Sequence, residues 1–238
     1  MLIAIPSKGR AGRTKTDKVL PNFGTFCVPE SELHQYSYIK NVIGVPISVK
    51  GITETRNWIL KNSKDKWVVF LDDDVKNCGW MRFDERKCIN IKEESEDFWI
   101  NEFVRAFDVM EGMGFKMWGM KTESAPRSVY PYKPILTKTY LTASCMGMIN
   151  DGEFYFDEDF KVKEDYEICL RHIQKYGGIL GIRYLYWENE HWVTDGGCKD
   201  YRTVNMEKDA IKRLIEKYPG MIRSVKRKES EMVIELNL

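Results

Sequence analysis

The 238-residue sequence lacks the features that mark membrane and fibrous proteins. It has no run of 18 apolar residues, so no transmembrane helix is expected. Its 37 basic and 36 acidic residues leave a net charge of only +1, which argues against a protein that coats nucleic acid. The N-terminal segment MLIAIPSKGR has no basic region before its apolar residues. We therefore expect a short strand there rather than a secretory signal.

Several catalytic and redox signatures are also missing. The phosphate-binding patterns GxxxxGK[ST] and GxGxxG are absent, which argues against P-loop kinases and dinucleotide-dependent enzymes. The pattern GxSxG of serine hydrolases is absent too. The six cysteines form no CxxC pair and match no zinc-site spacing. Without a secretory signal, we expect reduced thiols and a cytoplasmic location.

Strand and helix patterns alternate through the first 75 residues. Strands are predicted at 2–6, 24–29, 41–46 and 66–71, with helices at 30–37 and 52–61. The last of these strands, KWVVFL, is an unbroken apolar run, as expected where both faces of a sheet are covered. This alternation predicts an α/β fold with a mostly parallel sheet and helices packed on it.

The second half of the chain is more mixed. We predict helices at 97–110, 164–176 and 202–217, and strands at 141–149 and 179–187, followed by a strand-like tail. No internal repeat, linker or low-complexity segment interrupts the pattern. We therefore expect one domain over residues 1–238.

Three consecutive acidic residues, Asp72, Asp73 and Asp74, follow the apolar strand 66–71. Ligands of open α/β sheets bind in the crevice beyond the carboxyl ends of the strands. Alternation along an extended chain points Asp72 and Asp74 the same way. Clustered carboxylates repel each other unless a cation is present, and hard oxygen ligands suit Mg²⁺ or Mn²⁺. The triple predicts a divalent-metal site, and a helix-capping acidic turn is the alternative.

The charges are unevenly distributed along the chain. Residues 1–20 contain five basic residues against Asp17 alone, whereas residues 151–167 contain eight acidic residues and two lysines. Such segments suit a site that binds a phosphorylated substrate together with a metal. Ordinary solvated surface explains the same charges, so this pattern alone leaves both interpretations open.

Five segments in chain order resemble a known enzyme class. KWVVFLDDDV (66–75) is similar to the strand and DxD motif of GT-A glycosyltransferases, which use nucleotide-sugar donors. IPSKGRAGRTKT (5–16), GITETRNWIL (51–60) and KEDYEICLRHI (163–173) resemble the nucleotide-binding loop, the donor-facing helix and the segment with the acceptor's base. Together with FCVPESEL (26–33), the set resembles the TET-associated glycosyltransferases and related phage enzymes.

This resemblance implies a GT-A (Rossmann-like) α/β fold, with a mostly parallel central sheet and flanking helices. The donor would bind about residues 1–110 and the acceptor about residues 111–200, with a C-terminal helix and tail at about 201–238. The implied donor is a UDP-sugar, and the implied metal, Mn²⁺ or Mg²⁺, is assigned to Asp74, Asp72 and His191. The residues assigned to the donor are Pro6, Ser7, Arg10, Arg13, Lys15, Arg56, Asp72, Asp73, Gly196 and Gly197.

The resemblance also assigns catalysis to Asp165, with Glu164 as the second choice. Asp165 would take the proton of the acceptor hydroxyl, which implies a single displacement with inversion at the anomeric carbon. Acidic residues at a helix start are also stabilised by the helix dipole, which is the structural alternative for this pair. His191 and the Gly196-Gly197 pair have structural alternatives as well, as an ordinary histidine and a turn.

The family adds sugars to 5-hydroxymethylated pyrimidines in DNA, so the implied acceptor is hydroxymethylated DNA, with hydroxymethylcytosine as the first choice. No membrane and no obligate protein partner are implied, and a phage-encoded protein would act in the host cytoplasm. Three alternatives stay open. They are a GT-A enzyme acting on a glycan, lipid or protein hydroxyl, a non-catalytic nucleic-acid-binding module, and a nucleotidyltransferase.

Overall fold

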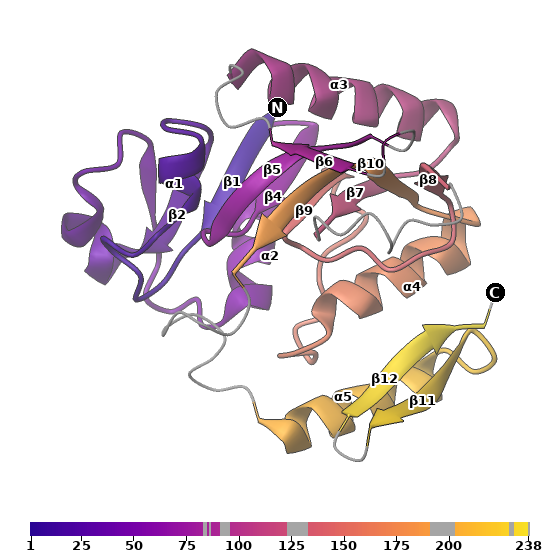
Figure 1. The fold of residues 1–238 in the computed structure, drawn as a ribbon. Helices are drawn as coiled ribbons and strands as arrows, with labels where there is room; N and C mark the ends of the chain where they lie inside the picture. Colours follow the sequence, from indigo (N-terminus) through magenta and orange to yellow (C-terminus); the bar gives the residue numbers. More distant parts are fainter. Residues whose placement is uncertain are drawn as a thin grey trace.

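A ten-stranded sheet forms the centre of the molecule (Figure 1). The computed structural model describes residues 1–82, 85, 87–90, 96–122, 133–190, 203–228 and 231–237. The strand order is β3-β2-β1-β4-β9-β7-β10-β5-β6, with β8 beside β10. The strands are β1 (Leu2–Pro6), β2 (Thr25–Pro29), β3 (Val42–Val45), β4 (Trp67–Leu71), β5 (Val75–Arg82), β6 (Lys87–Asn90), β7 (Met117–Lys121), β8 (Ile135–Leu136), β9 (Cys145–Ile149) and β10 (Leu180–Asn189).

The strand directions bring three chain segments to one edge of the sheet. Strands β3, β2, β1 and β4 are parallel. Strand β9 lies antiparallel between β4 and β7, and β10 is parallel to β7. The carboxyl ends of β1, β4 and β10 therefore lie on the same side. Ligands of open α/β sheets bind at this edge.

Helices cover both faces of the sheet (Figure 1). One apolar layer joins α3 to the sheet through Trp99, Phe103 and Phe107. The opposite layer packs α2 and α4 against Phe70 and its neighbours. The helices are α1 (Thr16–Val19), the 3₁₀ helix η1 (Glu30–Tyr36), α2 (Ile52–Asn62), α3 (Glu96–Gly112), α4 (Glu164–Tyr176) and α5 (Val204–Lys217). The result is a three-layer α/β/α arrangement with two aromatic-rich cores.

A smaller C-terminal unit packs beneath α4. It consists of α5 and the antiparallel hairpin of β11 (Ile222–Lys228) and β12 (Glu231–Leu236). Its apolar core includes Leu214 and Tyr218, which pack with Leu170 of α4. None of the helices in the described part of the chain has the length and apolar character to cross a membrane.

The predicted α/β class is confirmed, and the parallel first half matches the expectation closely. Strands β5, β6 and β7 were not predicted. The β5 segment alternates polar and apolar residues around a glycine, and MWGMK in β7 has no β-branched residue, so neither has the usual strand composition. The C-terminal tail forms a complete hairpin rather than one strand.

Candidate functional site

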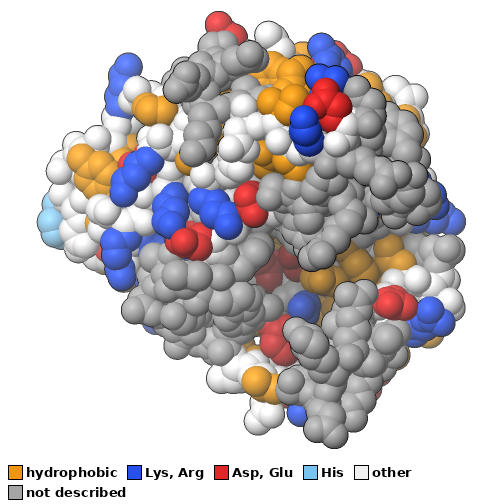
Figure 2. Space-filling model, viewed as in Figure 1, with side chains coloured by type: hydrophobic (Ala, Val, Ile, Leu, Met, Phe, Trp, Pro, Cys, Tyr) orange, Lys and Arg blue, Asp and Glu red, His pale blue; other side chains and the backbone are white. Residues whose placement is uncertain are grey.

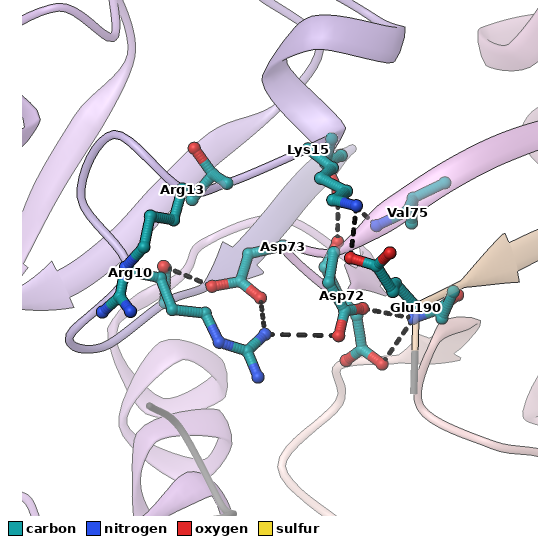
Figure 3. A network of polar contacts seen from close by, with 12 residues as sticks. Arg10, Arg13, Lys15, Asp72, Asp73, Val75 and Glu190 are labelled. Carbon is teal, nitrogen blue, oxygen red and sulfur yellow. Dashed lines mark hydrogen bonds and ion pairs between the residues drawn. The ribbon is translucent and has the colours of Figure 1, made fainter. Parts of the chain in front are cut away.

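Polar side chains from β1, β4 and β10 converge at the carboxyl edge of the sheet. Asp72, Asp73 and Asp74 form the turn between β4 and β5, directly after the buried strand ends at Leu71. On the face shown in Figure 2, acidic and basic side chains are visible in a hollow near the centre of the view. Figure 3 shows the network around the three aspartates.

Asp72 and Asp74 point toward the same side chain, that of Asn189 at the end of β10. The Asn189 amide nitrogen Nδ2 donates to Asp72 Oδ2 at 2.8 Å and to Asp74 Oδ1 at 2.9 Å. The Ser144 hydroxyl also donates to Asp72 Oδ2, at 3.0 Å. The two carboxylates therefore share one small region, as the alternation of an extended chain predicts.

Asp73 points the opposite way, into the loop after β1. It is 4% exposed, and its carboxylate accepts hydrogen bonds from the Ser7 hydroxyl and from Arg10 Nη1, each at 2.5 Å. The Ser7 hydroxyl is also hydrogen-bonded to the buried Tyr36 hydroxyl at 2.8 Å. Burial raises the pKa of Asp73, and the Arg10 guanidinium opposes that shift. Asp73 therefore anchors the loop after β1, whereas Asp72 and Asp74 face Asn189.

The proton affinity of Asp74 is unusual. Burial, followed by repulsion from Asp72 and Asp73, raises its pKa to about 7, although Arg10 lies 3.3 Å away. A carboxylate that is costly to ionise is stabilised by any cation that joins it. The electrostatics of the turn therefore favour an additional positive charge beside Asp74.

The basic residues of the loop after β1 differ in their placement. Arg10 lies against Asp73 and Asp74, whereas Arg13 turns away and donates to the Gly9 carbonyl (Figure 3). Lys15 forms an ion pair with Glu190, which follows β10. Pro6 ends β1 opposite Cys27 of β2. The loop thus places the positively charged side chains of Arg10 and Lys15 near the aspartate turn.

Arg56 on α2 connects the aspartates to the start of α4. Its Nη1 lies 2.6 Å from Glu164 Oε1, and its Nη2 lies 3.9 Å from Asp72 Oδ1. The α2 helix is fixed here because Asn57 binds both the carbonyl and the amide of Phe156, at 2.9 and 2.7 Å. The two segments that the sequence assigned to donor and acceptor therefore meet in one ion-pair network.

Asp165 begins α4 beside this network. The residue keeps partial exposure, but protein atoms surround its carboxylate. This burial, followed by repulsion from Glu164, raises the pKa of Asp165 to about 7. The preceding residue, Lys163, has the left-handed backbone angle φ 64°, which is unusual for a long side chain. A carboxyl with a pKa near neutrality can accept a proton at physiological pH, which is the property of a general base.

The turn between β4 and β5 has the chemistry of a divalent-cation site. Two carboxylates and one asparagine converge, and oxygen ligands of this kind suit Mg²⁺ and Mn²⁺. Within the residues that the structure describes, no three His, Cys, Asp or Glu side chains lie close enough together to hold a metal. Cations of this type often use one or two carboxylates and complete their shell with substrate phosphates, so Asp72 and Asp74 fit such an ion.

Three expected site residues, His191, Gly196 and Gly197, lie outside the described residues. Four residues of the network were not predicted, namely Tyr36, Ser144, Asn189 and Glu190. Asn189 carried a usable signal, because it is a polar residue at the end of an apolar strand that leads to His191. Ser144 and Tyr36 carried none, since only the sheet order brings them to the turn.

Comparison with known proteins assigns this arrangement to a glycosyltransferase class. The family model described as TET-Associated Glycosyltransferase matches residues 1–197. No curated protein matches the chain. Among solved structures, S. aureus TarS 1–349 in complex with UDP-GlcNAc is 12% identical with a TM-score of 0.53. That match covers 90% of this chain and 67% of that one.

A second structural match is glucosyl-3-phosphoglycerate synthase from Mycobacterium tuberculosis in complex with Mn²⁺, UDP-glucose and glycerol 3-phosphate. It is 10% identical with a TM-score of 0.52, and the match covers 94% of this chain and 83% of that one. The chain spans 60% to 72% of the length of the TarS 1–349 chains. These likenesses confirm the predicted GT-A fold.

Proposed function

The chain belongs to the TET-associated glycosyltransferase family, and we propose that it moves a sugar from a UDP-sugar to 5-hydroxymethylated pyrimidines in DNA. Hydroxymethylcytosine is the first choice of base. The observation that carries the proposal is the network in which Arg56 joins Asp72 of the aspartate turn to Glu164 beside Asp165. One arginine thus contacts both the aspartate turn and the residue next to the candidate base.

The donor would bind over the aspartate turn. When bound to Asp72 and Asp74, Mg²⁺ or Mn²⁺ would act as a Lewis acid toward the donor diphosphate. Arg10 and Lys15 lie beside the same turn, and arginine can pair two phosphate oxygens at once. His191 is the third proposed metal ligand, and Gly196 and Gly197 belong to the proposed donor site. Arg13 also belongs to it, provided that its side chain leaves the Gly9 carbonyl to reach the donor. The synthase and TarS crystals with UDP-sugars support a UDP-sugar donor for this fold.

The acceptor hydroxyl would lose its proton to Asp165. An alcohol is a weak nucleophile, so a positioned carboxylate contributes on the order of 10²–10⁴-fold to the rate. The pKa of Asp165, about 7, places a substantial ionised fraction at neutral pH. Attack from the side of this base, opposite the departing UDP, gives inversion at the anomeric carbon. Glu164 is held by Arg56 and positions that guanidinium rather than taking the proton.

The DNA acceptor is the finer part of the proposal, and the family description supports it. Hydroxyl groups of other molecules are the second candidate, because the mycobacterial synthase of the same fold was crystallised with glycerol 3-phosphate. We also propose that residues 1–110 bind the donor and residues 111–200 the acceptor, within one catalytic domain.

The test is sugar transfer from a panel of UDP-sugars to three matched duplexes. These contain hydroxymethylcytosine, hydroxymethyluracil or unmodified cytosine at one position, and mass spectrometry measures the added sugar. We expect a mass gain only on a hydroxymethylated duplex and only with a divalent cation. Donor hydrolysis without transfer to any duplex would favour another hydroxyl acceptor. Salt-sensitive DNA binding with neither hydrolysis nor transfer would identify a non-catalytic module.

A further inference from the structure

Asn189 lies at an irregularity of β10 that turns its side chain toward the aspartates. The pairing of β10 with β5 shifts register between Glu188 and Asn189, so that Asn189 lies opposite Val75. The next residue, Glu190, donates its backbone N–H to the Asp74 carbonyl at 3.1 Å. Irregularities of this kind redirect side chains and are frequent beside active sites. Here the irregularity directs the Asn189 amide into the aspartate turn.

The two ends of the Asn189 amide have very different surroundings. Nδ2 lies between the Asp72 and Asp74 carboxylates, at 2.8 and 2.9 Å, so each of its two protons has an acceptor. Oδ1 is buried and has no hydrogen-bond partner among the described residues, and the residue as a whole is only 5% exposed. Buried polar atoms normally have a partner, so this carbonyl oxygen requires an explanation.

We propose that Asn189 is a ligand of the divalent cation and binds it through Oδ1. The inference rests on the proposed function, because it assumes the cation at Asp72 and Asp74. In the structure, Nδ2 faces the two carboxylates as a partly positive group. A half-turn about the terminal side-chain torsion, which is broadly two-fold, exchanges the oxygen and nitrogen. The oxygen then joins the two carboxylates around the cation.

The charges of the site explain why each orientation suits one state. Three oxygen atoms facing one another repel, so the cation-free turn favours the nitrogen at the centre. With a divalent ion present, the amide oxygen becomes an attractive hard ligand and the amide protons are repelled. The amide can therefore present either a hydrogen-bond donor or an oxygen ligand to the turn without a change of backbone.

The change in cation affinity when the Asn189 amide is removed distinguishes a metal ligand from a hydrogen-bond donor. A donor competes with the cation for Asp72 and Asp74, so its removal would leave cation affinity unchanged or increase it. Removal of a ligand decreases the affinity. We would titrate Mn²⁺ into the full chain, with and without UDP, and measure free Mn²⁺ by its electron paramagnetic resonance signal.

The comparison uses the wild type, Asn189→Ala and the matched control Asn77→Ala. Asn77 lies on β5, also has a buried Oδ1 without a partner among the described residues, and donates to Asn90 at 2.7 Å. We expect Asn189→Ala to weaken Mn²⁺ binding roughly tenfold or more, and Asn77→Ala to leave it unchanged. Unchanged or tighter binding by Asn189→Ala overturns the inference while leaving the proposed function intact. A wild type that binds no Mn²⁺ in either condition overturns both.

A second measurement avoids substitution altogether, in case the alanine variant does not fold. In protein labelled with ¹⁵N-asparagine, Mg²⁺ should shift the side-chain amide signals of Asn189 and leave those of Asn77 in place. Asn189 signals that do not move at saturating Mg²⁺ would overturn the inference, since the amide protons would still face the carboxylates.

Discussion

Arg56 and Glu164 are 108 positions apart in the sequence, and they form a buried ion pair with 2.6 Å between Nη1 and Oε1. The Arg56 side chain is 4% exposed and the Glu164 side chain 12% exposed. The second guanidinium nitrogen of Arg56 lies 3.9 Å from Asp72. The buried guanidinium of Arg56 thus contacts both the start of α4 and the aspartate turn.

Loss of Arg56 should destabilise the fold. Arg56→Met leaves the Glu164 carboxylate buried without this partner, and removal of one member of a buried pair costs about 3–5 kcal/mol. Urea denaturation measures the change in the free energy of unfolding. The double variant Arg56→Met/Glu164→Leu should recover most of the loss, because it buries no unmatched charge. A double variant as unstable as the single one would show that Arg56 acts through other contacts.

Removal of the Asp74 charge should preserve the stability of the fold but decrease sugar transfer. Asp74→Asn relieves repulsion within the aspartate turn, so the cation-free protein should be as stable as the wild type or more stable at neutral pH. Transfer should fall on the order of 10³-fold, because the variant loses a proposed carboxylate ligand of the metal. Thermal denaturation and transfer rates measured on one preparation provide the check. A variant with full activity in the presence of a chelator would refute the metal assignment.

Removal of the Asp165 carboxylate should decrease transfer without affecting donor binding. Asp165→Asn cannot accept the acceptor's proton, so we expect a loss on the order of 10²–10⁴-fold. Calorimetry with UDP and Mn²⁺ should give an affinity near that of the wild type. Asp159→Asn is the matched control, because Asp159 belongs to the same acidic segment and its side chain is 81% exposed. Equal losses in both variants would argue against a specific role for Asp165.

The pH dependence of transfer should follow the ionisation of Asp165. Its pKa is raised from 3.8 to about 7, so the carboxylate that we propose as the base forms only as the pH rises through that value. We therefore expect kcat/KM for the acceptor to rise with pH and level off above about pH 7. At pH 6 it should be roughly tenfold below the plateau. A flat profile between pH 5 and pH 8 would contradict this assignment.

The hydroxyl of Tyr218 should contribute to stability through Glu167 on α4. Glu167 is fully buried, and Tyr218 donates to its Oε1 at 2.7 Å. Tyr218→Phe removes a hydrogen bond to a charged group, which costs about 1.5–3 kcal/mol. Tyr176→Phe is the control, because the Tyr176 hydroxyl binds Glu153 at the surface and its loss should cost less. Equal costs in urea denaturation would show that burial does not strengthen the Glu167 contact.

The sequence was most informative where local pattern and tertiary environment agree. The strand 67–71 and the helix 164–176 were predicted within one residue, because the first is a continuous apolar run and the second ends at Gly177. The aspartate turn was also recognisable, because three acidic residues directly after a buried strand are unusual.

Residues whose neighbours come from distant segments were not predictable in this way. Arg56 and Asn57 lie on the buried face of α2, where a hydrophobic pattern predicts apolar residues. Their burial makes sense only with Glu164 and Phe156 beside them, and nothing local in the sequence indicates those contacts. Asn189 was missed because the predicted strand stopped two residues short of it.

The buried Glu167 has a consequence for comparisons among related enzymes. Lys217 and Tyr218, which bind its carboxylate, lie beyond residue 197, where the family match ends. The helix that presents Asp165 is thus braced by a segment outside the shared sequence pattern. Replacing this C-terminal segment would leave Arg171 as the remaining ion-pair partner of the buried Glu167, so it should disturb the helix that carries the proposed base before it affects donor binding.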